Sequence, residues 1–229
     1  MAFGITGTPG GGSTASPAAF NVAYTVVSGT NKLFVGITHG GNSAAAASAV
    51  ITWNTTESLT LVTSSGVDAG FSSVAWFSLD NPTAASANVT TTITNGEQTG
   101  VHIISFGEVD SVGTPSTNTG TGTNPSVTVV DSASDNIVIS ALCTDNENQT
   151  TTEANTLIFE VENLSNDTDH NSQYKTATGA STVMSWTNAS TQGTDWAASG
   201  LAVKGAAGAA AALSIAPIIQ NYRNMGLMN

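Results

Sequence analysis

Short apolar runs that alternate with Thr, Ser and Asn constrain the fold of this chain more than any other feature. Within a run, apolar residues recur at every second position, as Val127 and Val129 or Ile137 and Ile139 do. This period of two is typical of a strand with one buried face and one exposed face. Clusters of Gly, Pro, Asn, Asp and Ser separate the runs at spacings of about 8 to 15 residues, as turns between short strands do.

These runs predict an all-β fold, an antiparallel β-sandwich or jelly roll, because many short strands at such spacings are typical of both architectures. No stretch before residue 205 has a convincing apolar period of 3.6 residues, so no long helix is expected there. The expected strands are FNVAYTVV, KLFVGITH, AVITWN, SLTLVTSS, FSSVAWFSL, ANVTTTIT, VHIISFGEV, PSVTVV, NIVISALCT, NTLIFEVE, SQYKTAT, STVMSWTN and WAASGLAVK.

The composition divides the 229 residues into three parts. Residues 1–17 contain the Gly- and Pro-rich stretch GTPGGGSTASP, which predicts a flexible N-terminal arm or connector. Residues 18–204 hold the predicted strands and form the expected β-sandwich domain. Residues 205–229 begin with an Ala/Gly spacer and end in an apolar segment, so they are expected to form a short helical or extended tail.

The apolar tail admits two interpretations. Pro217 suits the first turn of a short helix and Gly226 its end, but so short a helix needs a surface to pack on. The tail either packs on its own sandwich or docks on another subunit of an assembly. The spacer favours the second interpretation, because a tether is useful mainly when the tail must reach. The predicted partner-binding residues are Ile215, Ile218, Ile219, Tyr222, Met225 and Leu227.

The charge balance excludes several classes of partner. Four Lys and Arg residues stand against 16 Asp and Glu residues, for a formal net charge of -12. Nucleic-acid binding and contact with anionic lipid both need clustered cations, so neither is expected.

The N-terminal residues lack the basic and apolar regions of a secretion signal, and no apolar run is long enough to span a membrane. Cys143, the single cysteine, lies in an apolar run and is expected to be a buried structural thiol.

Three longer stretches and the closing strand resemble a family of β-sandwich modules found in phage structural proteins and some bacterial surface proteins. The stretches are SGTNKLFVGITHGG, VAWFSLDNPTAASANVTTTITNG, GVHIISFGEVDSVGTPSTNTGTGTNPSVTVVDSASDNIVISAL and WAASGLAVKG. The resemblance covers roughly residues 18–204 and lies in layout and composition. It implies a sandwich fold and a role as a capsid decoration or cement protein, a head fibre or a tail-tip part. The tail lies outside it.

The histidines do not have the spacing of a catalytic or zinc site. His39 is expected at the end of a strand, His102 within a strand, and His170 in a polar loop. The chain contains no HxxxH, HxH or CxxC spacing and no Gly-x-Ser-x-Gly elbow, so neither a zinc site nor a hydrolytic triad is predicted. We therefore expect a protein that is not an enzyme.

Two acidic clusters are the weak candidates for a cofactor, which would be calcium. Asp145 and Glu147 lie in TDNENQTTTE, and Asp167 and Asp169 lie in SNDTDHN, both expected to be polar loops. Oxygen-rich loops can bind calcium, although Asp and Asn loops are usually simple turns. Paired carboxylates could also serve glycoside hydrolysis, but no aromatic platform lies near them in the sequence. No other cofactor is expected.

The four tryptophans separate the two leading functions. Trp53, Trp76, Trp186 and Trp196 all lie in predicted strands, and at least three of them are expected in the core. Our leading hypothesis is a non-enzymatic virion structural protein that decorates or cements a phage capsid through subunit contacts made by its terminal arms, residues 1–17 and 205–229. Its partners would be its own copies, with a trimer favoured, and a lattice such as a major capsid protein. The alternative is a glycan- or receptor-binding module of a phage fibre or bacterial surface protein, which would need an exposed aromatic residue.

Overall fold

The computed structural model describes residues 3–15, 19–40, 46–64, 72–93, 98–130, 132–145, 151–164, 168–188 and 195–205. Within these ranges the chain is built almost entirely of antiparallel strands, which form four sheets, so the all-β prediction is confirmed. The only helical element described is a single 3-10 turn at Ala46–Ser48. The described part therefore contains no helix of the length and hydropathy that a membrane crossing requires.

The first half of the chain forms two sheets, which we name central sheet 1 and outer sheet 1. Central sheet 1 contains β1 (Gly4–Ile5), β2 (Gly10–Thr14), β4 (Lys32–Gly40), β7 (Thr60–Ser64), β8 (Ser72–Asp80) and β10 (Gln98–Gly107). Outer sheet 1 contains β3 (Phe20–Val26), β5 (Val50–Trp53), β6 (Glu57–Ser58) and β9 (Ala85–Thr92). The order in central sheet 1 is β1, β10, β4, β8, β7, with β2 also on β10, and in outer sheet 1 it is β3, β9, β5, β6.

The second half forms central sheet 2 and outer sheet 2. Central sheet 2 contains β11 (Val109–Val112), β12 (Ser116–Thr121), β14 (Ile137–Asp145), β16 (Thr156–Leu164), β17 (Thr168–Thr176) and β19 (Asp195–Gly205). Outer sheet 2 contains β13 (Ser126–Val130), β15 (Thr151–Glu153) and β18 (Ser181–Asn188). The order in central sheet 2 is β11, β19, β14, β17, β16, with β12 also on β19, and in outer sheet 2 it is β13, β18, β15.

The two halves repeat one topology. Each strand of central sheet 1 has a counterpart at the same place in central sheet 2, and the three strands of outer sheet 2 correspond to β3, β9 and β5. The pairing registers agree as well: Gly40 lies opposite Gln98 and Ser72, as Asp145 lies opposite Asp195 and Thr168. The region predicted as one sandwich is therefore an internally duplicated chain, a feature that the strand pattern alone did not predict.

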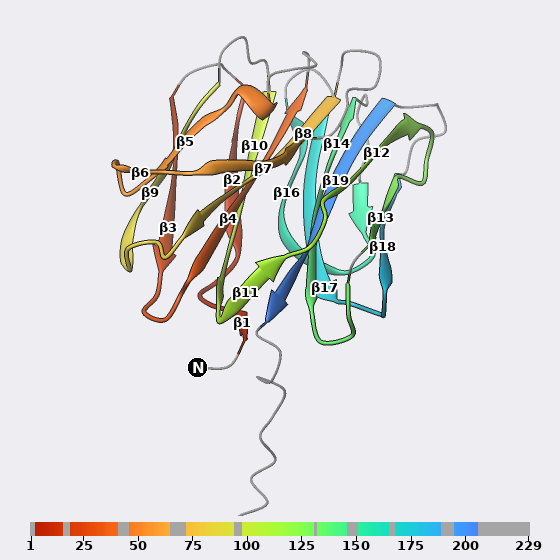
Figure 1. Cartoon of the computed structure of the whole chain (residues 1–229). Helices are drawn as coiled ribbons and strands as arrows, with labels where there is room; N and C mark the ends of the chain where they lie inside the picture. Colours follow the sequence, from red (N-terminus) through yellow and green to blue (C-terminus); the bar gives the residue numbers. More distant parts are fainter. Residues whose placement is uncertain are drawn as a thin grey trace, which may run out of the picture.

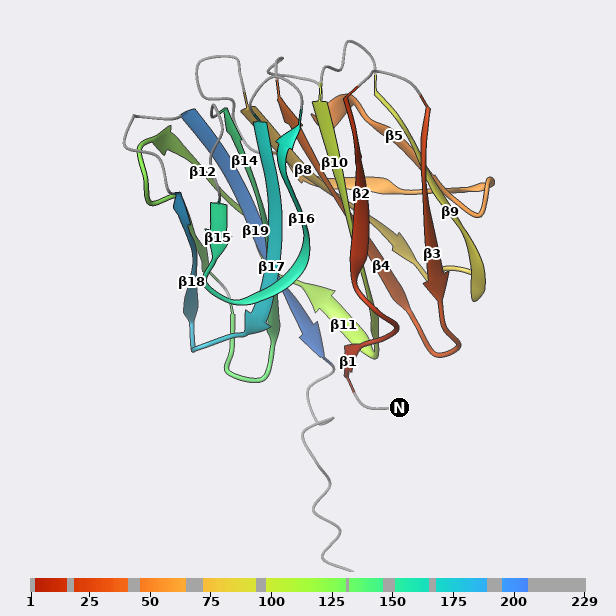
Figure 2. The same ribbon diagram turned by 180° about the vertical axis from the view of Figure 1, so that it is seen from behind.

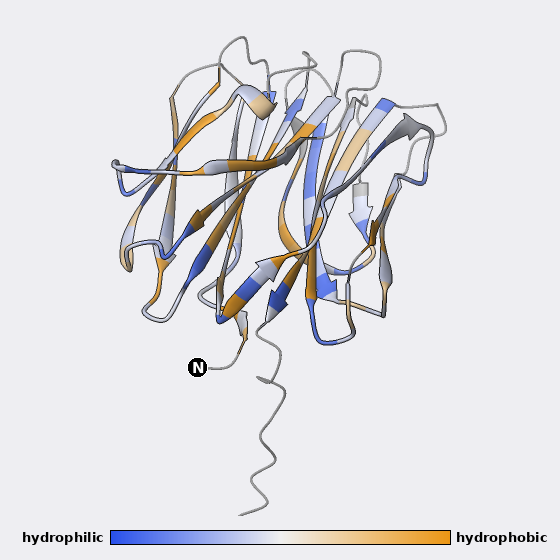
Figure 3. Ribbon diagram, viewed as in Figure 1, coloured by the Kyte–Doolittle hydropathy of each residue, from blue (hydrophilic) through white to orange (hydrophobic). Residues whose placement is uncertain are grey.

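The four sheets are stacked in the order outer sheet 1, central sheet 1, central sheet 2, outer sheet 2 (Figures 1 and 2). Three apolar cores fill the spaces between neighbouring sheets. The first includes Trp53 and Ile103, the middle one Trp76 and Leu201, and the third Trp186. In Figure 3 strands of both central sheets carry apolar stretches in orange, next to polar stretches in blue. Burial of these cores is the main stabilising term of the fold.

This stacking explains two kinds of strand in the sequence. β3 lies in an outer sheet and alternates strictly, with Val22, Tyr24 and Val26 buried and the residues between them exposed. β4 and β10 lie in a central sheet with both faces covered, so from Leu33 to Gly40 and throughout β10 every residue is buried. A strand buried on both faces reads as a nearly continuous apolar run rather than an alternation.

The contacts between the two central sheets are reciprocal. Trp76 of the first half donates an indole hydrogen bond to the carbonyl of Ser199 in the second, at 3.3 Å. Ser172, which the registers place at the counterpart position of Trp76, contacts His102, the counterpart of Ser199, at 2.8 Å. Such exchange of roles is the property of an interface between two copies related by a twofold axis. The two halves therefore meet as a symmetric dimer would.

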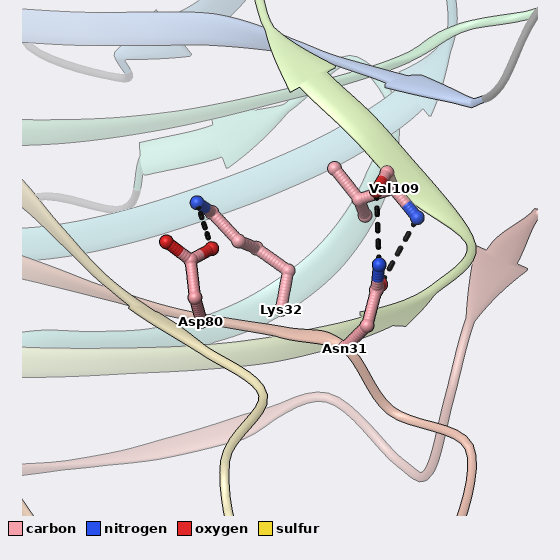
Figure 4. A network of polar contacts seen from close by, with 4 residues as sticks. All are labelled: Asn31, Lys32, Asp80 and Val109. Atoms are coloured by element: carbon pink, nitrogen blue, oxygen red, sulfur yellow. Dashed lines mark hydrogen bonds and ion pairs between the residues drawn. The ribbon is translucent and has the colours of Figure 1, made fainter.

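A single residue connects the halves. Glu108 lies between β10 and β11 and has a φ of 56°, in the left-handed region that few non-glycine residues adopt. The Asn31 side chain holds this crossing in place through two hydrogen bonds with the main chain of Val109, and the neighbouring Lys32 forms an ion pair with Asp80 (Figure 4). The crossing therefore has a defined geometry.

Both chain ends were predicted to be arms. At the N-terminus that prediction is wrong for residues 4–5 and 10–14, which form β1 and β2 on the edge of β10. The glycines permit this pairing, because a Cβ on Gly11 would lie 2.2 Å from the carbonyl oxygen of Val101 and 2.5 Å from the Phe159 ring. At the other end, the tail from residue 206 onward lies outside the described residues, and with it Ile215, Ile218, Ile219, Tyr222, Met225 and Leu227.

Candidate functional site

The three histidines are fully buried close to the middle of the stack. His102 lies between the central sheets, where its Nε2 is 2.7 Å from the Thr38 hydroxyl and its Nδ1 2.8 Å from the Ser172 hydroxyl. The Ser172 hydroxyl also donates to the carbonyl of Phe159 at 3.1 Å, and the Thr38 hydroxyl to the carbonyl of Gly100 at 3.4 Å. Both ring nitrogens of His102 thus have a hydrogen-bonding neighbour, as a buried polar side chain requires.

Burial holds all three imidazoles in the neutral form. It lowers the pKa of His102 and of His170 to about 3 and the pKa of His39 to about 4. For His170, the neighbouring His102 and His39 lower the pKa further through charge repulsion. A histidine with such a pKa does not exchange protons near neutral pH, so none of the three has the property of a general acid or base.

His170 lies in a buried strand, and the prediction that it and Asp169 belong to a polar loop is wrong. Both are in β17, and the first six residues of this strand are buried. Several polar side chains of this strand have partners inside the protein. Asn171 donates to Glu153 and Glu160 and accepts from the Trp186 indole. Satisfied polar groups can be buried at little net cost, so hydropathy gave no signal for this strand.

Two nitrogens of the histidines have no hydrogen-bond partner among the described residues, Nε2 of His39 and Nε2 of His170. The Nδ1 of His170 is 3.8 Å from the Cys143 sulfur, and Cys143 is buried as predicted. His39 and His170 belong to different layers: His39 shares its strand face with Ile37 in the first core, whereas His170 contacts Cys143 in the middle core. They therefore do not form one pocket.

The calcium candidates are divided by the fold. Asp145 is the last residue of β14, Asp169 is buried in β17, and Glu147 and Asp167 lie outside the described residues. Within the described ranges, no group of three or more His, Cys, Asp or Glu side chains is placed to hold a metal ion. The candidate set therefore remains a prediction.

All four tryptophans are buried, as the sequence predicted for at least three. Trp53, Trp76 and Trp186 are at most 1% exposed, and Trp196 is 6% exposed. Two of the indole nitrogens donate hydrogen bonds inside the protein: that of Trp53 to the carbonyl of Thr83, and that of Trp186 to the Asn171 side chain. A tryptophan platform for a sugar ring is therefore not formed by these residues.

The accessible candidate site is a groove of about 760 Å³ on outer sheet 1. One wall is the segment between β1 and β2 with the start of β2, and the other is formed by β3 and the adjacent part of β9. The lining residues are Gly7, Thr8, Pro9, Gly10, Gly11, Ala23, Tyr24, Thr25, Val27, Ser86, Ala87 and Asn88. None of them is charged, so the groove offers small polar groups, main chain and apolar surface.

Sequence reasoning missed this groove because it treated residues 7–17 as a free arm. A short internal repetition was the available signal: Gly-Thr-Pro occurs at residues 7–9 and again at 113–115, and Thr-Val-Val at 25–27 and 128–130. The first pair directly precedes β2 and β12, and the second lies at the ends of β3 and β13. Comparisons of the chain with protein-family models, curated proteins and solved structures found no match.

Proposed function

We propose that this chain is a non-enzymatic structural protein that works by contact with other polypeptide chains, as a decoration or cement protein of a virus capsid. The observation that carries the proposal is the burial of the chemically reactive side chains. The three histidines, the cysteine and the four tryptophans are all buried, and their described contacts are with other parts of the chain. A protein with this surface acts through shape and main-chain groups.

Two further features support this function. The resemblance over residues 18–204 is to sandwich or jelly-roll modules of phage structural proteins, in which binding needs no catalytic group. The net charge of -12 makes copies repel one another, so association has to come from apolar or main-chain contacts. We assign this contact to the tail, residues 205–229, and the assembled form to a homo-oligomer, with a trimer favoured, on a lattice of a second protein in the virion.

Truncation after Gly205 tests this function, because every described strand lies within residues 3–205. We expect the truncated chain to keep the circular dichroism spectrum and thermal transition of the full chain and to be a monomer by light scattering, while the full chain is an oligomer. Two results contradict the proposal: a truncated chain that unfolds, because the tail would then belong to the core, or a full chain that is itself monomeric at all concentrations.

A further inference from the structure

The two halves of the chain are each complete as a pair of packed sheets. Every strand pair among the described residues lies within residues 4–107 or within residues 109–205. Each half also has an apolar core of its own, because the first core contains residues of the first half alone and the third core residues of the second half alone. A segment with its own sheets and its own core has the properties of a domain.

The halves meet through side-chain packing. The middle core takes Phe34 and Trp76 from the first half and Leu201 from the second. The hydrogen bonds of Trp76 with Ser199 and of Ser172 with His102 also cross this interface from side chains. No described strand continues across it. The interface therefore needs two complementary halves, and its contacts are the same whether these halves belong to one chain or to two.

The connection between the halves is strained. Glu108 is exposed, follows β10 directly and has a φ of 56°. In this left-handed conformation the Cβ atom lies too close to the following carbonyl oxygen, which disfavours it by about tenfold. The conformation is required because the chain must turn at this one residue for the second half to pack on the first.

An extended Glu108 would release the strain and separate the halves. The chain would then run from β10 into β11 without turning back, and the second half would leave the first. Middle-core residues such as Trp76 and Leu201 would be exposed to water, and this exposure is far more unfavourable than the strain at one residue. The open chain therefore needs a partner that covers both exposed faces.

A second open copy of the same chain has the complementary faces. We propose that two copies exchange halves, so that the first half of each packs on the second half of the other. The exchange rebuilds the middle core and changes the conformation of Glu108 alone. Asn31 of one copy then holds the main chain of Val109 of the other by the two hydrogen bonds described above. A strained one-residue hinge favours such an exchange, and the reciprocal pairing of two chains leaves no face uncovered.

The protein concentration decides between the closed chain and the exchanged dimer. Short linkers hold two modules at an effective concentration on the order of 1 mM. The dimer contains two hinges, and relief of both favours it by about 100-fold. Exchange should therefore compete at a concentration on the order of 10 µM. It should occur mainly during refolding, because duplicated chains pair their domains wrongly at that stage and the folded middle core opens slowly.

This association is separate from the subunit contact of the proposed function. That contact is assigned to the tail, residues 205–229, whereas exchange uses the interface between the two central sheets. The two kinds of contact are compatible in one assembly, so the experiment must report on the middle interface and not only on molecular mass.

A disulfide across the middle interface distinguishes exchanged halves from closed ones. A Cβ on Gly40 of β4 would lie 3.3 Å from the Cβ of Thr168 of β17, close to the separation of about 3.5–4.5 Å in disulfides. In the full chain with Gly40→Cys and Thr168→Cys, the bond lies within one chain when the halves are closed and between two chains when they are exchanged. After refolding from urea at high protein concentration, we expect a covalent dimer on a denaturing gel without reductant, and a monomer after refolding at low concentration.

Substitutions of Glu108 in this double-cysteine chain test the hinge. Glu108→Gly removes the strain of the left-handed conformation and should raise the concentration needed for half-maximal dimer at least tenfold. Glu108→Val places a β-branched residue there, which disfavours the conformation further and should lower that concentration. Thr55→Gly is the matched control, because it relieves a φ of 68° inside the first half and should leave the dimer share unchanged.

Three results would overturn the inference. A bond within one chain at every refolding concentration means that the halves stay closed, and any oligomer seen by light scattering then belongs to the tail contact of the proposed function. Equal dimer shares for Glu108→Gly and Glu108→Val mean that the hinge does not govern association. A covalent dimer in the chain with Gly40→Cys alone, or with Thr168→Cys alone, means that the link does not report on this interface.

Light scattering on chains without added cysteines gives an independent measurement if the disulfide pair does not fold. Glu108→Gly and Glu108→Val have the same tail and lose the same glutamate side chain, so a difference in their mass comes from the hinge. After refolding at one concentration, the Glu108→Val chain should contain the larger share of dimer. Equal mass distributions of the two folded variants contradict the exchange of halves.

Discussion

Asn31 forms a two-point contact with Val109: its amide donates to the carbonyl of Val109 at 2.9 Å, and its side-chain oxygen accepts from the Val109 nitrogen at 3.0 Å. The contact is between halves, because Asn31 precedes β4 of the first half and Val109 begins β11 of the second. It fixes the main chain at the point where the chain passes from one central sheet to the other. The side chain is partly buried there, so water replaces it poorly.

Replacement of this clamp should loosen the crossing. Asn31→Ala leaves a partly buried N–H and C=O of Val109 without their partner, and we expect a loss of about 1–3 kcal/mol in the free energy of unfolding. Urea denaturation measures it. Asn124→Ala is the matched control, since Asn124 is exposed and hydrogen-bonds only a neighbouring threonine in the described contacts. Equal effects of the two substitutions would show that the clamp contributes nothing special.

Acid should destabilise the protein well before its carboxylates titrate. The unfolded chain protonates each histidine near pH 6.5, whereas the folded chain keeps His102 and His170 neutral down to about pH 3. The unfolded state therefore binds more protons, and stability falls as the pH falls from about 6.5 toward 3. The slope should approach about 1.4 kcal/mol per pH unit for each such histidine.

Urea denaturation at several values between pH 7.5 and 5 measures this slope. His170→Asn should reduce it by the share of one histidine, even though the substitution also lowers stability at pH 7.5. A stability that is flat over this interval would mean that the imidazoles are solvated in the folded chain.

Gly100 is required by the packing between the central sheets. A Cβ at this position would lie 2.5 Å from the Thr38 hydroxyl and 2.8 Å from Cβ of His170, so Gly100→Ala should cost about 1–3 kcal/mol of stability. The control is Gly4→Ala, where a Cβ meets nothing within 4 Å and little change is expected. Thermal melting of the two variants checks the difference, and similar transitions would contradict the packing described.

One substitution in the turn between β5 and β6 should stabilise the fold. Asn54 and Thr55 have φ values of 48° and 68°, and Thr56 donates to the carbonyl of Trp53, which is the geometry of a type I′ turn. Thr55→Gly creates the preferred Asn-Gly pair and should raise stability by about 0.5–1 kcal/mol. Thr56→Gly, one residue later and without a positive φ, should lower it. A denaturation midpoint that moves down for Thr55→Gly would exclude this geometry.

The sequence predicts those strands whose buried residues are apolar, and it misses those whose buried residues are polar or glycine. β3 and β13 alternate cleanly and were predicted; β4, β10 and β14 read as apolar runs and were predicted as well. β17 was missed in its first half because Asp169, His170 and Asn171 are polar although they are buried, which leaves no apolar period. β2 was missed because its glycines are required by close packing, while glycine in a sequence usually indicates a loop.

The duplication becomes visible only when the strand pairing of the two halves is compared. Equivalent positions often hold unlike residues, such as Trp76 and Ser172 or Thr38 and Cys143, because each side of the central interface adapts to the other. Only short matches such as Gly-Thr-Pro and Thr-Val-Val persist.

The adjacency of Phe3 and Gly205 has a consequence for chain order. A single residue joins the halves at Glu108, and the outer ends of the two halves also meet in space. A circular permutant that joins Gly205 to Phe3 by a short loop and opens the chain at Glu108 would trace the same path with the halves exchanged. We therefore expect the same architecture to form whichever half is synthesised first.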